Sequence, residues 1–502
     1  MRGRLEEATI PELQADMRSG RTTSQKLVKA YLRRIAEIDR AGPRLRSVAE
    51  VNPDALKLAR QLDDERRRKG PRGPLHGIPV LVKDNIATTD RMETTAGSLA
   101  LVGSRPRNEA RVVRKLREAG AVILGKASLS EWANFRSSHS SSGWSARSGQ
   151  VRNPYVLDRS PCGSSSGSAV AVAANLASVA LGTETDGSVL CPSSMNGVVG
   201  IKTTLGLVSR MGVVPIAHSQ DTVGLIARTV TDAAILLGAI VGIDGDDATT
   251  RSSAGRYTRD YTKFLDPDGL RGARIGVPRE VYFGYSDKAD AIAEAALARM
   301  RKMGAKIIDP ANIPTAKTMG EGELTVLLHE FKADLNRYLS GLKTSKVRSL
   351  NQVIEFNRRH GQKELKYFGQ DLLIKAQKTA GLRDRKYLRA LRQNQLLSRQ
   401  KGIDHVMDKY RLDALVAPTN SPAWTIDLVN GDNILGGSSR PTALAGYPAI
   451  TVPAGFSLGL PVGITFMGRA YSEPTLIKLA YAFERATRHR APPRFLATAA
   501  SE

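Results

Sequence analysis

The chain has 502 residues, with 74 lysines and arginines against 49 aspartates and glutamates, and a formal net charge of +25. Hydrophobic residues make up 41% of it, enough for a sizeable core, so a wholly disordered chain is excluded. Its two cysteines exclude a disulfide scaffold or a cysteine-rich zinc protein, and no apolar run approaches the roughly 18 residues of a membrane span.

Hydrophobic periodicity predicts helices and strands that alternate along the chain. Apolar residues recur at helical spacing over 23–39, where Thr23 or Ser24 can cap the first turn, and the short apolar run at 78–82 predicts a buried strand. Further helices are predicted at 53–69, 109–119, 168–180, 229–241, 287–303, 323–340, 349–377, 385–409 and 474–488. Further strands are predicted at 121–124, 213–216, 273–277, 305–308, 412–417, 449–452 and 461–466.

This alternation predicts an α/β fold built around a layered sheet. The length alone suggests about three domains, but no low-complexity linker divides the sequence, so we predict one large domain over 1–502. Within it, 1–72 forms an N-terminal helical flank. Residues 320–411 form a helical insertion that we expect to shape the substrate site.

The positive charge lies mostly outside the middle of the chain. Residues 340–411 carry 18 basic and 6 acidic side chains, and residues 1–72 carry 18 and 11, whereas residues 150–240 carry five of each. Such charge makes nucleic acid the first partner to consider, but no zinc-finger spacing, basic zipper or aromatic RNA-binding strand is found. We interpret the basic regions as solvated helix faces and do not expect nucleic-acid binding. The first residues do not resemble a signal peptide, which predicts a cytoplasmic protein.

Two Ser/Gly-rich segments, 160–168 and 182–188, bracket the charge-free stretch at 168–180. Neither matches a phosphate-binding loop, and the seven histidines show no metal-ligand spacing, so no metal or cofactor is predicted. A serine nucleophile without a suitable histidine can use a lysine that burial keeps neutral. Lys83 directly follows the buried strand at 78–82 and fits that role. Spacing alone also allows Lys83 to be solvated or to pair with Asp84.

Three short motifs together carry a family resemblance: Lys83-Asp84-Asn85, Gly-Ser-Ser at 163–165 and Gly-Ser at 187–188. They resemble the amidase signature family, and supporting segments extend the resemblance over nearly the whole chain: 77–79, 124–132, 196–210, 219–237 and 444–468. The resemblance implies a single large α/β domain with a central mixed sheet covered by helices on both faces. It also implies a serine hydrolase that cleaves linear carboxylic amides through an acyl-enzyme and needs no cofactor.

The resemblance also implies a catalytic set. In that family a lysine, a serine held by a cis peptide bond and a nucleophilic serine act together, and the matching positions are Lys83, Ser164 and Ser188. The expected oxyanion hole consists of the backbone N–H groups of Thr185, Asp186, Gly187 and Ser188. Ser138 is expected to line the acyl site. Ser165 is expected either to hydrogen-bond near Lys83 as part of the substrate site or to be a structural hydroxyl.

One stretch departs from the common family pattern, Asp-Thr-Gly-Gly-Ser-Ile-Arg. Here it reads Glu-Thr-Asp-Gly-Ser-Val-Leu over 184–190, which is similar to the peptide amidase branch, whose members remove the C-terminal amide of peptides. A peptide or small-molecule amide is therefore the expected substrate. Arylacylamides, esters and carbamates remain open on the same catalytic set. A tRNA-dependent amidotransferase A-type subunit is a further alternative, which Leu190 in place of the arginine disfavours.

Two other features near the motifs have local interpretations. Asp186 is expected to cap its own turn rather than to bind a substrate amine. Cys162 and Cys191 flank the two serine motifs, and we expect them to be buried thiols rather than a disulfide.

Overall fold

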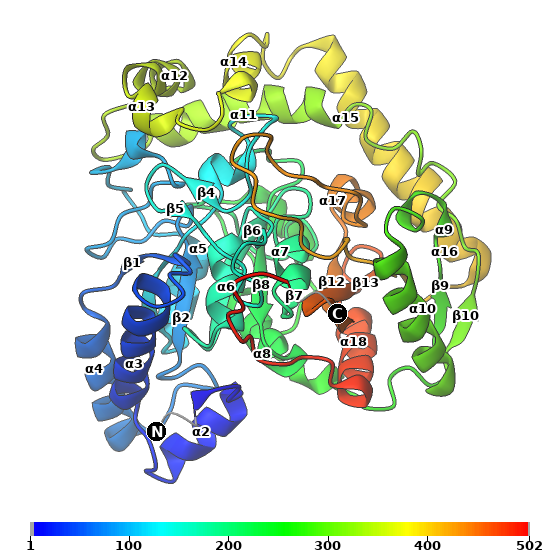
Figure 1. The fold of residues 1–502 in the computed structure, drawn as a ribbon, viewed down its shortest axis with the longest axis horizontal. Helices are drawn as coiled ribbons and strands as arrows, with labels where there is room; N and C mark the ends of the chain where they lie inside the picture. Colours follow the sequence, from blue (N-terminus) through cyan, green and yellow to red (C-terminus); the bar gives the residue numbers. More distant parts are fainter. Residues whose placement is uncertain (1–4, 500–502) are drawn as a thin grey trace.

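A mixed sheet of 11 strands organises the computed structural model, which describes residues 5–499 (Figure 1). The strand order is β1-β3-β2-β6-β8-β7-β12-β13-β11-β9-β10. β2 pairs in parallel with β3 and β6, β9 pairs in parallel with β10 and β11, and the strands between these groups are antiparallel. The strands of this sheet are β1 (Val48–Val51), β2 (Pro79–Lys83), β3 (Val122–Ala127), β6 (Val179–Glu184), β7 (Val199–Lys202), β8 (Thr222–Ala227), β9 (Arg274–Gly276), β10 (Lys306–Ile308), β11 (Ala414–Pro418), β12 (Ala449–Ser457) and β13 (Leu460–Met467). β4 (Trp144–Ser145) and β5 (Gly149–Gln150) form a separate ribbon.

Helices cover both faces of this sheet, as expected for the α/β class. α6 contacts β2, β3, β6 and β8, whereas α8 contacts β6, β7 and β8 and also packs on α18. All eight residues of α6 are buried, in agreement with its lack of charge. The main helices are α2 (Ile10–Arg18), α3 (Ser24–Arg34), α4 (Ala55–Lys69), α5 (Arg111–Glu118), α6 (Ser166–Ala173), α7 (Leu190–Met195), α8 (Val230–Ile240), α9 (Arg279–Tyr282), α10 (Asp287–Lys302), α17 (Arg440–Ala445) and α18 (Glu473–Thr487).

The helical region 320–411 lies along one edge of the molecule, at the top and right of Figure 1. It contains α11 (Glu323–Ser340), α12 (Leu350–Arg359), α13 (Gly361–Glu364), α14 (Asp371–Gln377), α15 (Arg385–Ser398), the π-helical segment η6 (Arg399–Ile403) and α16 (Asp404–Tyr410). The predictions of continuous helices over 349–377 and 385–409 are therefore wrong. The first is broken after His360 and again before Asp371, and the second is interrupted at Gly402, whose ψ of −107° is not helical.

Two further predictions near the middle of the chain need correction. The predicted helix 168–180 ends at Ala173, and its last residues belong to strand β6, because alanine and valine without charge suit a buried strand as well as a buried helix. The predicted strand 213–216 is a loop with a single bridge from Val213 to Ile86. Strands β1, β4, β5, β6, β7 and β8 were not predicted. No helix within residues 5–499 is both long and apolar enough to cross a membrane.

Candidate active site

Lys83 is the last residue of β2, and its side chain is fully buried. Its Nζ atom lies 2.8 Å from Ser164 Oγ, 3.0 Å from Ser165 Oγ and 2.9 Å from Thr183 Oγ1. Asp84 instead pairs with Arg147 at 2.9 Å. The structure therefore places Lys83 among hydroxyl groups, and neither of the two alternatives, solvation or pairing with Asp84, describes it.

The electrostatic setting of Lys83 favours a neutral amine. Burial lowers the pKa of Lys83 to about 7, and the Glu184 and Asp221 carboxylates only partly offset this shift. Desolvation penalises the ammonium because the neutral hydroxyl and carbonyl groups around it replace only part of its hydration. A large fraction of Lys83 is then free to accept a proton near neutral pH.

The bridging position, Ser164, follows a cis peptide bond between Gly163 and Ser164. Cis bonds that do not precede proline are rare in proteins. Ser130 donates its N–H to the Ser164 carbonyl at 3.1 Å. A Cβ atom at Gly163 would lie only 2.2 Å from Ser130 Oγ, so only glycine fits there.

Ser188 follows strand β6 on a tight turn, and its side chain is nearly buried. Gly187 has φ +83°, a conformation that residues with a Cβ rarely adopt. Within residues 5–499, the N–H groups of Asp186, Gly187 and Ser188 have no protein acceptor. Three successive donors of this kind are the arrangement that an oxyanion hole needs, and the assignment of the oxyanion hole to this turn stays a prediction.

The Glu184 side chain holds the chain that follows this turn by accepting two backbone hydrogen bonds. Its Oε2 atom accepts hydrogen bonds from the N–H groups of Val189 at 2.6 Å and Leu190 at 2.9 Å. The side chain is buried, and its pKa is raised by burial and lowered in part by Lys202. The two segments that carry the serines also meet directly, since Ser165 donates its N–H to the Ser188 carbonyl at 3.1 Å.

The Asp186 carboxylate points away from its own turn, contrary to the expected turn cap. It accepts a hydrogen bond from Ser439 Oγ and lies 3.8 Å from Arg440 Nε. Arg440 Nε also lies 3.4 Å from Glu323, the first residue of α11. Burial and the neighbouring Asp186 raise the pKa of Glu323 to about 8. The turn 185–188, the expected oxyanion turn, thus contacts the helical region 320–411 through the charged groups of Asp186, Arg440 and Glu323.

Ser138 lies on an exposed loop, and its hydroxyl donates to Asp371 at 2.9 Å. Its N–H donates to the same carboxylate at 3.0 Å. Both polar groups of Ser138 therefore donate hydrogen bonds to α14. Contact of Ser138 with an acyl group stays a prediction.

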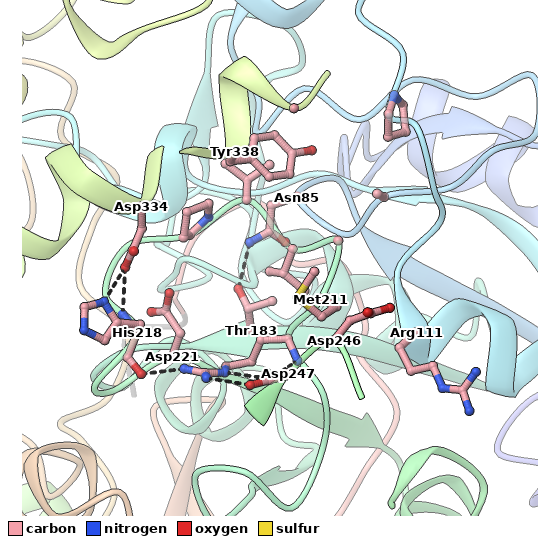
Figure 2. A pocket seen from close by; sticks show the side chains of 18 of the residues that line it. Asn85, Arg111, Thr183, Met211, His218, Asp221, Asp246, Asp247, Asp334 and Tyr338 are labelled. Carbon is pink, nitrogen blue, oxygen red and sulfur yellow. Dashed lines mark hydrogen bonds and ion pairs between the residues drawn. The ribbon is translucent and has the colours of Figure 1, made fainter. Parts of the chain in front are cut away.

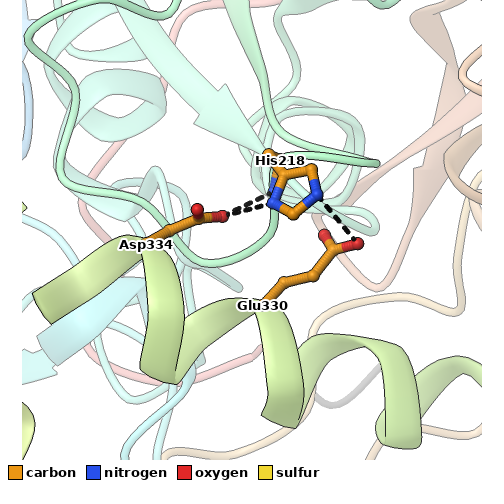
Figure 3. A group of neighbouring side chains, drawn as sticks. All are labelled: His218, Glu330 and Asp334. Atoms are coloured by element: carbon orange, nitrogen blue, oxygen red, sulfur yellow. Dashed lines mark hydrogen bonds and ion pairs between the residues drawn. The ribbon is translucent and has the colours of Figure 1, made fainter. Parts of the chain in front are cut away.

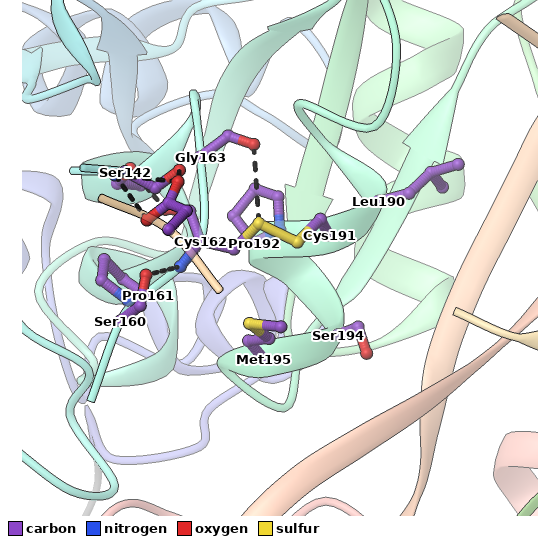
Figure 4. The surroundings of a disulfide bond; sticks show 12 residues. Ser142, Ser160, Pro161, Cys162, Gly163, Leu190, Cys191, Pro192, Ser194 and Met195 are labelled. Carbon is purple, nitrogen blue, oxygen red and sulfur yellow. Dashed lines mark hydrogen bonds between the residues drawn. A yellow bond between two sulfur atoms is a disulfide. The ribbon is translucent and has the colours of Figure 1, made fainter. Parts of the chain in front are cut away.

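The two cysteines form a disulfide, which corrects the expectation of buried thiols (Figure 4). The turn before Ser164 and the first turn of α7 bring their Cα atoms to 6.0 Å, well within the range for a disulfide. Sequence alone did not predict it, because 29 residues separate Cys162 from Cys191 and the bond depends on the approach of two loops. Disulfides are typical of oxidising compartments, so the cytoplasmic expectation gains no support from this bond.

Comparison with known proteins assigns the family, because the amidase family profile matches residues 26–477. The chain belongs to the amidase family. A probable amidase of Arabidopsis thaliana is 45% identical, over 98% of this chain and 92% of the relative. The A-type subunit of the glutamyl-tRNA(Gln) amidotransferase of Myxococcus xanthus is 35% identical, over 96% of this chain and 97% of the relative.

Solved structures resemble this amidase throughout. The native peptide amidase from Stenotrophomonas maltophilia has 53% identity and a TM-score of 0.94, covering 98% of this chain and 99% of the other. A peptide amidase in complex with the competitive inhibitor chymostatin has 54% identity and a TM-score of 0.95, covering 97% and 99%. The protein is an amide-hydrolysing enzyme with the amidase signature fold.

A cavity of about 500 Å³ has Thr183, a hydrogen-bond partner of Lys83, in its wall, and Figure 2 shows the side chains that line it. Asn85, Thr183 and Thr185 line it, whereas Lys83, Ser164 and Ser188 do not. Thr183 Oγ1 is the shared boundary, because it receives a hydrogen bond from Asn85 Nδ2 at 3.0 Å as well as facing Lys83. The cavity is therefore adjacent to the site but separate from the serine nucleophile position.

His218, Glu330 and Asp334 are grouped closely enough to hold a metal ion (Figure 3). Each ring nitrogen of His218 faces a carboxylate, Nδ1 at 2.6 Å from Asp334 and Nε2 at 3.4 Å from Glu330. Burial lowers the pKa of His218, but the two carboxylates outweigh it and raise the pKa overall. The two ring contacts join α11 to the loop before β8.

Sequence reasoning missed three polar residues around the candidate site. Thr183 hydrogen-bonds Lys83, Asn85 donates to Thr183, and Glu184 accepts from the two N–H groups that follow Ser188. Asn85 lies in the quoted Lys-Asp-Asn motif, and the other two lie in the quoted segment 182–188. Their polar side chains, at the end of buried strand β6 and just after buried strand β2, were the available signal, because a buried polar group needs a partner.

Proposed function

We propose that the amidase hydrolyses linear carboxylic amides through Ser188 as nucleophile, Ser164 as proton bridge and Lys83 as base. The single observation that supports this most is the buried Lys83 amine, 2.8 Å from Ser164 Oγ and surrounded by hydroxyl groups. A neutral amine has two N–H groups and one lone pair. Ser165 Oγ and Thr183 can accept the two N–H groups, which leaves the lone pair for the Ser164 hydroxyl.

The proton and electron movements then follow. Ser188 Oγ attacks the amide carbon while its proton passes to Ser164 Oγ and the Ser164 proton passes to Lys83. The oxyanion forms beside the N–H groups of the 185–188 turn, in a site shielded from water. The protons return along the same route to the amide nitrogen, the C–N bond breaks, and the amine leaves. Water then attacks the acyl ester on Ser188 and releases the carboxylic acid.

For the substrate we propose peptides with a C-terminal amide. The support is the likeness to peptide amidase structures, one of them bound to chymostatin, at 53–54% identity and TM-scores of 0.94–0.95. The solved A-type amidotransferase chain from Thermotoga maritima is more distant, at 30% identity and a TM-score of 0.70. We also propose that region 320–411 shapes the acyl site, since Glu323 reaches the oxyanion turn through Arg440.

A hydrolysis screen of amidated peptides, arylamides, esters and carbamates tests this proposal, with Ser188→Ala as control. The expected result is release of ammonia from amidated peptides and fluorophosphonate labelling of Ser188, located by peptide mass spectrometry. Full activity of Ser188→Ala would refute the nucleophile. Activity on arylamides or esters alone would refute the peptide substrate but keep the catalytic set.

A further inference from the structure

The disulfide joins the two segments that carry the proposed catalytic serines (Figure 4). Cys162 directly precedes Gly163, whose peptide bond to Ser164 is cis. Cys191 is the second residue of α7 and lies three residues after Ser188. Both cysteines are buried, at 4% and 7% exposure, so the bond lies within the protein beside the site.

Hydrogen bonds also tie these two segments together. The Ser165 N–H donates to the Ser188 carbonyl at 3.1 Å, and Asn196 Nδ2 donates to the Pro161 carbonyl at 2.9 Å. The Ser165 hydroxyl also donates to the Thr183 carbonyl at 3.0 Å and accepts from the Thr183 N–H at 3.2 Å. The remaining polar contacts of the Cys162 turn are local or lead elsewhere, such as the Ser166 hydroxyl on the Cys162 carbonyl. The disulfide is thus the one covalent link between the bridging serine and the nucleophile apart from the chain itself.

The backbone at Cys162 needs such a restraint. Its φ is +56°, in the left-handed region that residues with a side chain rarely adopt. A conformation of this kind persists when surrounding contacts over-determine it. Proton transfer from Ser188 to Ser164 depends on their alignment, and a displacement of about 1 Å can cost on the order of 100-fold in rate.

We propose that the Cys162–Cys191 disulfide is a positioning element for catalysis, which holds the Ser164 turn at the distance from Ser188 that proton transfer requires. This proposal rests on the proposed function. The bond acts through the two serines and touches no substrate. Its loss is expected to lower kcat by about 10- to 100-fold while KM changes by less than about threefold.

The test compares wild-type enzyme with Cys162→Ser/Cys191→Ser before and after treatment with dithiothreitol. The dithiol thiolate attacks one sulfur to form a mixed disulfide, and its second thiol closes a ring, leaving two protein thiols and oxidised reagent. Mass spectrometry of alkylated peptides verifies the reduction. Wild-type kcat should fall and return on reoxidation, whereas the double variant should start low and not respond.

All forms are assayed well below their melting temperatures, and the rate of fluorophosphonate labelling at Ser188 is measured beside kcat. A purely structural bond would lower the melting temperature and leave both rates unchanged, and that result would overturn the proposal. If the buried disulfide resists reduction, the comparison of wild type with the double variant decides, by the same three measurements of kcat, labelling rate and melting temperature. Absence of labelling in oxidised wild-type enzyme would instead refute the proposed function.

Discussion

Two regions of the amidase use polar residues in opposite ways. The neutral region 150–240 buries its polar groups and pairs them closely, as Ser165 and Thr183 do around the Lys83 amine. Region 320–411 carries basic side chains on its exposed surface, where Arg383, in the turn before α15, and Arg389, within α15, face solvent. Net charge therefore does not locate the chemistry. Burial decides which charged groups have perturbed properties, because the surroundings replace water there.

The largest expected effect comes from the buried region. Ser188→Ala and Lys83→Ala should each lower kcat by about four decades, because nucleophile and base act as one unit. Steady-state kinetics on an amidated peptide measures this. The kcat of the double variant should lie no more than about tenfold below that of either single variant. If the two losses in kcat instead multiplied in the double variant, the two residues would act independently and not in the same step.

The second prediction tests where the helical region joins the core. Arg136 is fully buried, contacts Glu131 at 2.7 Å and reaches Glu364 of α13 at 3.7 Å. Arg136→Met would leave two buried carboxylates without their cation, so the free energy of unfolding should fall by about 3–5 kcal/mol. Chemical denaturation measures it.

A matched control for that change is Arg91→Met, which removes an exposed ion pair with Asp54 at 2.7 Å. This change should lower the free energy of unfolding by less than about 1 kcal/mol. If the free energy of unfolding fell equally in the two variants, burial would not determine how much each ion pair contributes to stability.

The third prediction concerns pH. Because burial lowers the pKa of Lys83 to about 7, the free base is scarce below pH 7 and abundant above it. With an uncharged substrate, log kcat/KM should rise by about one per pH unit below 7 and level off above it. If kcat/KM instead rose with a midpoint near pH 10, Lys83 would not act as a buried base with a lowered pKa.

The smallest expected effect lies on the basic surface. Arg383→Ala and Arg389→Ala should change kcat/KM by less than about twofold and stability by less than about 0.5 kcal/mol, because both side chains are exposed. A filter-binding titration should also show no tight, salt-dependent tRNA binding by wild-type enzyme. Strong binding that these changes weaken would assign the basic faces a role in nucleic-acid recognition.

Much of the fold could be predicted from local pattern. Thr23 accepts from the Lys26 N–H as a helix cap, and the run after Gly77 forms the buried strand β2. Prediction failed where the local signal is ambiguous. The alanine and valine stretch after Ser168 continues from helix α6 into strand β6, and only its pairing with β2 and β8 decides where the helix ends.

The sequence by itself determined the class of the protein, the position of Lys83 at the end of a buried strand, and the two serine segments. Only the tertiary structure decided their chemistry. The lowered pKa of Lys83, the Cys162–Cys191 disulfide and the contact of Glu323 with Arg440 beside the oxyanion turn all join residues distant in sequence. Local propensity acts over a few residues, whereas desolvation and alignment depend on which distant segments the fold brings into contact.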